Sequence, residues 1–209
     1  MKPVTGTAAF DVDALAWTRQ EGLLPAIIQD AATLRVLMLG YMDRAALLAT
    51  LAGGRVSFYS RSRQAPWRKG DSSGHWLELV RIECDCDADT LLVLARPHGP
   101  TCHLERCSCF PHAPGHVLAT LDALVEARMA APRDGYTDRL LAAGVPRMAQ
   151  KVGEEGVETA LALVGGDRDA LRGEAADLLY HLVVALRAAG SSIGEALAEL
   201  DARAGTAPS

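Results

Sequence analysis

The sequence predicts a two-domain protein, in which an α+β domain with a mainly antiparallel sheet precedes an all-α bundle. All five cysteines, all three tryptophans and all three phenylalanines precede residue 111, whereas residues 117–209 carry 21 alanines. The segment between 111 and 116 holds two prolines and a glycine, which can continue neither a helix nor a sheet ladder. We therefore expect one domain over residues 1–113 and another over residues 117–209.

Short apolar runs separated by turn residues predict the strands of the first domain. They cover residues 23–29, 34–39, 55–59, 77–83 and 90–95. After the second run, Asp43 is a good N-cap for an Ala/Leu-rich stretch that ends at Gly53 and Gly54. This stretch predicts one short helix over residues 44–51.

The second domain shows the three- and four-residue spacing of amphipathic helices. The apolar rows are Leu118, Leu121, Leu124 and Val125; then Val157, Leu161 and Val164; then Leu171, Leu178, Leu179, Leu182 and Val183. We expect these rows to pack together in a helical bundle.

Composition and charge restrict the class of function. With 49% hydrophobic and 22% charged residues, the chain can bury a core. No apolar stretch approaches the ~20 residues needed to cross a bilayer, and the first residues lack the pattern of a secretion signal. The net charge of −5 argues against attraction to nucleic acid. We expect a cytoplasmic protein with no membrane or nucleic-acid partner.

Five cysteines lie within 26 residues, at positions 84, 86, 102, 107 and 109. Their odd number, without a secretion signal, favours reduced thiols that bind a metal, most naturally zinc, over disulfides. The spacings differ from the paired Cys-x2-Cys of structural zinc modules, so a structural and a catalytic site both stay open. For Cys84 and Cys107 the better interpretation is a small buried hydrophobe.

Acidic residues alternate with the first cysteines. If this segment is extended, Asp85, Asp87 and Asp89 point to one face and Cys86 to the other. Three carboxylates on one face repel one another unless a hard divalent ion such as Mg²⁺ or Ca²⁺ joins them. The alternative is an acidic turn before a strand. His103, which follows a cysteine, is a candidate metal ligand or acid/base group.

A basic stretch precedes this cluster. Residues 44–70 carry six basic side chains and no acidic one. Arginine forks, hydroxyl groups and glycine-exposed amides bind phosphate, and a tryptophan can stack on a base. The candidate substrate-binding residues are Ser60, Arg61, Ser62, Trp67, Lys69, Gly70 and Ser73. The alternative is a solvated surface loop.

Taken in order, these motifs resemble the phosphoribosyl-AMP cyclohydrolases of histidine biosynthesis over about residues 10–110. The matching segments are residues 37–42, 60–62, 67–74, 85–89, 99–103 and 108–110. The resemblance implies a homodimeric zinc hydrolase that opens the adenine ring of phosphoribosyl-AMP between N1 and C6.

The same resemblance assigns the metal ligands. It implies zinc thiolates at Cys86, Cys102 and Cys109, with ligands drawn from both subunits, and Mg²⁺ carboxylates at Asp85, Asp87 and Asp89. His103 is then placed to move a proton to N1. The family usually has a basic residue where this chain has Cys107, which adds a competing thiol.

Carboxylates also gather on two helices of the second domain. One cation and three anions share a face of the first helix: Lys151, Glu154, Glu155 and Glu158. Like charges at these spacings destabilise a helix, and the lysine offsets only part of that repulsion. On the next helix, Glu174 and Asp177 share a face. Facing carboxylates on two helices make an oxygen-rich Mg²⁺ site. The alternative is two exposed charged faces.

This pattern resembles the all-α nucleotide pyrophosphohydrolases, and phosphoribosyl-ATP pyrophosphatase in particular, over about residues 117–203. The resemblance implies Mg²⁺-dependent attack of water on the triphosphate, which releases pyrophosphate and phosphoribosyl-AMP. It places the metal ligands at Glu155, Glu158, Glu174 and Asp177. Glu154 would orient or deprotonate the water, and Lys151 would hold a phosphate.

The two resemblances together predict a bifunctional hydrolase that binds an ATP-type nucleotide, Zn²⁺ and Mg²⁺. The alternative function is a zinc-stapled nucleic-acid or nucleotide binding module with a helical dimerisation domain. Residues 1–116 carry twelve charges of each sign, and such a balance argues against a nucleic-acid surface.

Overall fold

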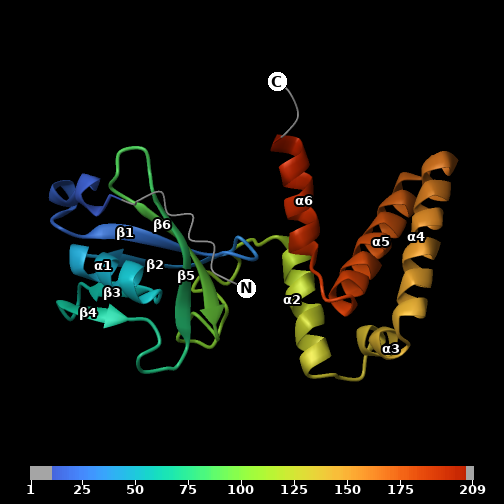
Figure 1. Ribbon diagram of the computed structural model, residues 1–209, viewed down its shortest axis with the longest axis horizontal. Helices are drawn as coiled ribbons and strands as arrows, with labels where there is room; N and C mark the ends of the chain where they lie inside the picture. Colours follow the sequence, from blue (N-terminus) through green and yellow to red (C-terminus); the bar gives the residue numbers. More distant parts are fainter. Residues whose placement is uncertain (1–10, 206–209) are drawn as a thin grey trace. The chain divides into compact units, whose positions relative to one another are not determined.

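The computed structural model describes residues 11–205, and the N-terminal residues that lack a secretion-signal pattern lie outside this range. The chain divides into two compact units, the first ending at Gly115 and the second beginning at His116 (Figure 1). Within the described range, no helix combines the length and the apolar character that a membrane span needs.

The first unit is built on a four-stranded sheet in the order β2-β1-β6-β5 (Figure 1). The strands are β1 (Leu24–Asp30), β2 (Val36–Met42), β5 (Trp76–Cys84) and β6 (Leu91–His98). The pairs β1/β2 and β5/β6 are antiparallel, and the central pair β1/β6 is parallel. The prediction of an α+β unit with a mainly antiparallel sheet is confirmed.

Helix α1 (Arg44–Gly53) begins where the sequence predicts, because the Asp43 carboxylate accepts a 2.7 Å hydrogen bond from the Ala46 amide. A two-stranded ribbon follows, β3 (Ser57–Ser60) and β4 (Ala65–Arg68). Strand β4 was not predicted, since Pro66 within it argues against a strand. Two short 3-10 helices, η1 (Val12–Ala14) and η2 (Trp17–Gln20), were also not predicted.

The core of the first unit lies on one face of the sheet. Alternate residues of β1 and β6 are fully buried there: Leu24, Ala26, Ile28, Leu91, Val93 and Ala95. Leu47 of α1 and Phe58 of β3 pack into the same cluster. Alternate strand residues thus form the apolar core, and the polar candidate residues lie mainly in the loops that connect the strands.

The second unit consists of helices only. They are α2 (Val117–Ala130), α3 (Tyr136–Ala142), α4 (Val145–Gly165), α5 (Arg168–Ala188) and α6 (Ile193–Gly205). Helices α4 and α5 form an antiparallel hairpin (Figure 1). Buried Asp122 of α2 accepts a 2.8 Å hydrogen bond from Nε of Arg187, which ties α2 to α5. The all-α prediction is confirmed, although α3 and α6 were not foreseen.

One predicted apolar row is helical but does not enter the core of this unit. On α4, Val157, Leu161 and Val164 are 60%, 65% and 87% exposed. The core forms instead around Val125, Met148 and Val183 with their neighbours. Helical spacing identifies residues that share a face, but it does not identify the surface that covers them.

Candidate active sites

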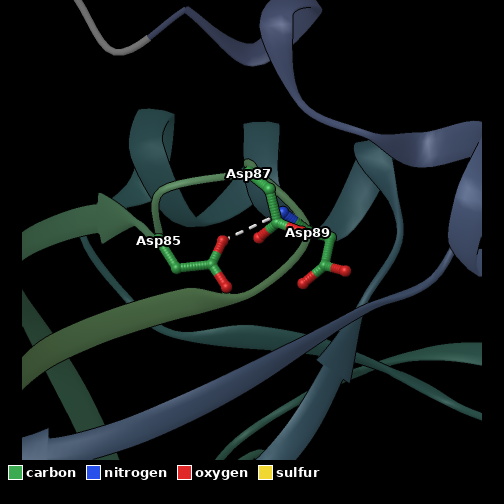
Figure 2. Close-up of side chains that lie close together, drawn as sticks. All are labelled: Asp85, Asp87 and Asp89. Carbon is green, nitrogen blue, oxygen red and sulfur yellow. Dashed lines mark hydrogen bonds between the residues drawn. The ribbon is translucent and has the colours of Figure 1, made fainter.

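Three aspartates meet in the turn between β5 and β6 (Figure 2). One carboxylate oxygen from each of Asp85, Asp87 and Asp89 lies within 4.8 Å of the other two. Of the two interpretations of this segment, the acidic turn before a strand is confirmed and the extended segment is wrong, because the chain turns here and Ala88 has a left-handed φ of +60°. The carboxylates therefore converge through a turn and not through strand alternation.

Internal hydrogen bonds hold this acidic turn. One oxygen of Asp85 accepts from the amides of Asp89 and Thr90, at 3.0 and 3.1 Å. Desolvation raises the pKa of Asp85, but the amide donors of Thr90 and Asp89 outweigh it and leave the pKa below its ordinary value. Arg19 lies 3.4 Å from Asp87. The arrangement is thus both an ordered turn and an oxygen-rich group that suits a hard cation.

Two of the three predicted zinc thiols come together in the loop that follows β6. Cys102 is buried, and its thiol is near enough to that of Cys109 for each to shift the pKa of the other. The Leu104 amide lowers the pKa of Cys102 despite desolvation, whereas desolvation and the charge of Cys102 raise the pKa of Cys109. Without a cation, the pair therefore favours one thiolate over two.

The edge of the sheet anchors this loop. The Cys109 amide donates to the Leu37 carbonyl at 2.8 Å, and the Ser108 hydroxyl donates to the Val36 carbonyl at 2.7 Å. Both carbonyls belong to β2, so these bonds fix the loop to the edge strand of the sheet.

The other cysteines lie apart from this pair. Cys86 is exposed in the acidic turn, and within residues 11–205 no group of three ligating side chains includes a cysteine. The interpretation of Cys84 and Cys107 as buried hydrophobes is wrong, because both are exposed. The Arg35 guanidinium lies 3.5 Å from the Cys107 sulfur. The nearby cation was not evident from the sequence, because Arg35 is 72 residues away.

Lys69 carries a buried positive charge beside the thiols. Its side chain belongs to a residue only 9% exposed, and its charge acts on Cys109, opposing the rise in that thiol's pKa. Among the described residues, no carboxylate lies within 4.0 Å of its ammonium group. A buried cation is costly unless it is paired, so this position favours an anionic ligand.

The remaining basic-stretch candidates are spread over the ribbon and its loops. Arg61 is exposed, with its guanidinium 3.8 Å from the centre of the Tyr41 ring. Trp67 stacks on Phe58 at 5.2 Å and packs against the core, so much of its surface is already occupied. The hydroxyl groups of Ser60 and Ser62 lie 3.4 Å apart. The Ser73 hydroxyl accepts a hydrogen bond from the His75 amide, and Gly70 has a φ of +93°.

A second carboxylate group lies on the α4/α5 hairpin. Oxygens of Glu155, Glu158 and Glu174 all lie within 4.8 Å of one another. Glu155 and Asp177 line an open cavity of about 420 Å³, together with Tyr136, Lys151, Tyr180 and His181. The predicted acidic residues of the two helices therefore do face one another, and Asp177 lies at the adjoining cavity.

Lys151 is the counter-ion of this group. Its ammonium lies 2.7 Å from Glu155 and 2.9 Å from Glu154. The hydrogen bond from Lys151 lowers the pKa of Glu155, against desolvation. Desolvation and the charges of Glu155 and Glu174 raise the pKa of Glu158. One lysine thus leaves the group with unbalanced negative charge.

His181 also lines the cavity, although the sequence predicts no role for it. Its Nδ1 lies 2.9 Å from the Asp177 carbonyl, which only accepts, so Nδ1 carries the proton. Its Nε2 lies 2.9 Å from the Tyr136 hydroxyl on α3. The four-residue spacing from Asp177 was visible in the sequence, but the partner from α3 was not.

Comparison with known proteins follows the division into two units. Residues 38–111 match the family model of phosphoribosyl-AMP cyclohydrolase, and residues 118–204 match that of phosphoribosyl-ATP pyrophosphohydrolase. The histidine biosynthesis bifunctional protein HisIE of Xanthomonas axonopodis pv. citri is 62% identical over 190 residues, which cover 90% of this chain and 92% of that protein. This chain belongs to the bifunctional histidine biosynthesis family.

Other members of the bifunctional histidine biosynthesis family align at similar length. The Xylella fastidiosa (strain Temecula1) protein is 59% identical over 204 residues, 97% of this chain and 98% of the relative. The Salmonella typhimurium protein is 52% identical over 176 residues, 83% of this chain and 87% of the relative. The chain is therefore a bifunctional enzyme with a cyclohydrolase domain followed by a pyrophosphohydrolase domain. A binding module without enzymatic activity does not fit this membership.

Proposed function

We propose that the two domains act in sequence on one nucleotide. The C-terminal domain hydrolyses phosphoribosyl-ATP to phosphoribosyl-AMP and pyrophosphate, and the N-terminal domain then opens the adenine ring between N1 and C6. The observation that carries this proposal is the separation of two chemically different groups: thiols with a buried lysine in one unit, and clustered carboxylates beside a cavity in the other.

The carboxylates of the C-terminal domain fit Mg²⁺. Glu155, Glu158 and Glu174 offer converging oxygens with excess negative charge, which is the donor set that a hard cation prefers. We assign Asp177, at the cavity, to the same site. When bound, Mg²⁺ supplies charge neutralisation for the phosphate oxygens.

Lys151 and Glu154 take supporting roles in this site. Two of the three ammonium donors of Lys151 are occupied by Glu154 and Glu155, which leaves one for a phosphate oxygen. Hydrogen bonds from Lys151 and Gln150 lower the pKa of Glu154, which weakens it as a base. We therefore assign Glu154 to orienting the attacking water.

The thiols of the N-terminal domain fit zinc. Cys102 and Cys109 are adjacent and cannot readily both ionise without a cation, and we propose that Cys86 of a second copy completes the set. When bound, zinc supplies Lewis acidity that lowers the pKa of water from ~15.7 towards ~7. His103, whose Nδ1 is 4.0 Å from the Cys102 sulfur, would carry the proton to N1.

The substrate of the N-terminal domain is anionic, and its contacts follow from charge. Lys69 would pair with a negative group of the nucleotide. Ser60, Arg61, Ser62 and the loop of Gly70 and Ser73 would bind phosphate, with Trp67 supporting this surface and offering its remaining face to the base. A Mg²⁺ ion held by Asp85, Asp87 and Asp89 would add a second cation.

The enzyme is proposed to work as a homodimer. The exposed row Val157, Leu161 and Val164 of α4 is an apolar face of the kind that a second copy covers. If Cys86 is the third zinc ligand, as proposed above, its separation from Cys102 and Cys109 means that a second chain would supply it. All five cysteines are free thiols, in keeping with a cytoplasmic location.

The test supplies phosphoribosyl-ATP and follows pyrophosphate release and ring opening separately. Asp177→Asn should strongly lower pyrophosphate release while supplied phosphoribosyl-AMP is opened at nearly the normal rate. Cys102→Ala should abolish ring opening and reduce bound zinc while pyrophosphate release continues. The exposed Cys84→Ala is the control and should change neither. If Asp177→Asn stops ring opening but spares pyrophosphate release, the assignment of the two reactions is wrong.

A further inference from the structure

An aromatic stack joins the start of β5 to the end of β6. Trp76 and His98 are cross-strand partners, and their rings are stacked with centroids 3.8 Å apart and planes only 3° apart. The Arg55 guanidinium lies 4.2 Å from the Trp76 ring. Two groups this close to one ring cannot share a face, so the indole is held between a cation and an imidazole.

Glu78 secures the outer side of this stack. Its carboxylate accepts from His98 Nε2 at 3.0 Å and from Arg96 at 3.1 Å. Arg96 is directly opposite Glu78 in the sheet, and the isolated bridge between Arg55 and Glu78 completes the arrangement. The stacked rings are therefore held in place by the pairing of β5 with β6 and by the hydrogen bond of His98 to Glu78.

Two glycines allow the flanking loops to approach the start of β5 closely, and Gly99 directly follows His98 of the stack. At Gly70, a Cβ would lie 2.7 Å from the Trp76 Cβ and 2.9 Å from the His75 backbone. At Gly99, a Cβ would lie 2.6 Å from the His75 ring. Both glycines have left-handed φ values, +93° and +96°. His75 is thus in close contact with both loops, and Trp76 with the loop of Gly70.

These two loops carry the groups that must act together. The loop before β5 holds Lys69 and Ser73, and the loop after β6 holds Cys102, His103 and Cys109. The charge of Lys69 already reaches Cys109. Any change in the relative position of the loops therefore alters the distance between the cationic substrate contact and the thiols.

We propose that the Trp76–His98 stack is a positioning pair, which fixes the substrate loop at residues 69–74 against the thiol loop at residues 99–109. This rests on the proposed function of the N-terminal domain. The stacked rings contact no reacting atom, and they act through the loops that they hold. Because misplacement of about 1 Å can cost about 100-fold in rate, the ring contact should matter to ring opening beyond its effect on stability.

Two substitutions at His98 separate the stack from its hydrogen bond. His98→Phe keeps a flat ring on Trp76 but loses the bond to Glu78, whereas His98→Gln keeps a donor for Glu78 but loses the ring. We expect kcat/KM for supplied phosphoribosyl-AMP to fall about 10-fold or more in His98→Gln, and to stay within about 3-fold of wild type in His98→Phe. Trp76→Leu should behave like His98→Gln, and Trp76→Phe should restore most activity.

Two further readouts and a control variant distinguish positioning from a general structural effect. Zinc content and pyrophosphate release should be normal in all four variants, and assays well below the unfolding midpoint remove the effect of stability. Arg96→Gln, which removes the other partner of Glu78, is the matched control and should leave ring opening unchanged. If His98→Gln retains wild-type kcat/KM, or if Phe fails where Gln succeeds, the stack has no positioning role. If the wild-type protein itself opens no ring, the proposed function fails instead.

Discussion

Replacing Lys151 by methionine tests whether this lysine mainly neutralises the carboxylate site. Its side chain is 18% exposed and contacts Glu155, which is 6% exposed, at 2.7 Å. Removing one partner of a buried pair costs about 3–5 kcal/mol, and the open cavity beside this pair argues for a smaller loss, about 2 kcal/mol. For a unit of this size that corresponds to a fall of about 10 °C in the unfolding midpoint.

The effect of Lys151→Met on the unfolding midpoint should depend on Mg²⁺ and on pH. Because the variant has one positive charge fewer beside the carboxylates, Mg²⁺ should bind it more tightly and raise its unfolding midpoint more than that of wild type. The pKa of Glu155 is lowered in the folded protein, so the Lys151 contribution is present above the unfolded pKa of about 4.3. It is lost as pH falls through the lower folded value, and the gap between variant and wild type should close there.

The assay is thermal unfolding followed by helical circular dichroism, with and without Mg²⁺, between pH 3 and 8. Arg147→Met is the control, because Arg147 is 47% exposed and lies 3.8 Å from Glu154, where an ion pair contributes little. A variant with an unchanged midpoint, an unchanged response to Mg²⁺ and only a raised KM for phosphoribosyl-ATP would contradict a neutralising role for Lys151. Lys151 would then be a phosphate contact and not a neutralising group.

Three further predictions concern other positions. Glu158→Gln should raise the unfolding midpoint measured without Mg²⁺, because it relieves repulsion from Glu155 and Glu174. Mg²⁺ affinity and pyrophosphate release should both fall in this variant. A lower midpoint would show that the three carboxylates do not repel one another. Gly70→Ala should lower the free energy of unfolding by at least about 1–2 kcal/mol and slow ring opening, because φ at this position is positive and the added Cβ would overlap Trp76. Gly74→Ala has the same φ penalty without an overlap, so its loss of stability should be smaller. Cys107→Arg, measured by zinc content per chain, should leave the stoichiometry unchanged; a loss would show that Cys107 is a ligand.

Local sequence determined most of the elements. Asp43 caps α1 because a carboxylate directly before an Ala/Leu-rich run can accept from a free amide of the first turn, here that of Ala46. Short apolar runs bounded by turn residues predicted β1 and most of β6, which extends beyond the predicted run to His98. Where local signals conflict, the prediction failed: Pro66 lies within β4, which survives as part of a short ribbon because β3 pairs with it.

The sequence predicts the geometry of one candidate metal group but not of the other. Helical spacing was sufficient to put Glu155 and Glu158 on one face of α4, since a helix repeats every 3.6 residues. The aspartates converge through a turn with Ala88 at positive φ, which their alternating spacing does not reveal. The contacts of Arg35 with Cys107 and of Tyr136 with His181 join residues 72 and 45 positions apart, and no local pattern encodes them.

By itself, the sequence determined the two-part organisation, the residue types of both sites and the family to which they belong. Those properties follow from composition and short-range spacing, which the chain carries whether or not it is folded. Only the tertiary structure shows which side chains are near one another. Cys102 lies close to Cys109 and forms no three-ligand group with Cys86, and Lys69 is buried near these two thiols. Leu161 of α4 stays exposed. Such contacts depend on how distant segments pack, and packing free energy belongs to the whole fold and not to any one segment.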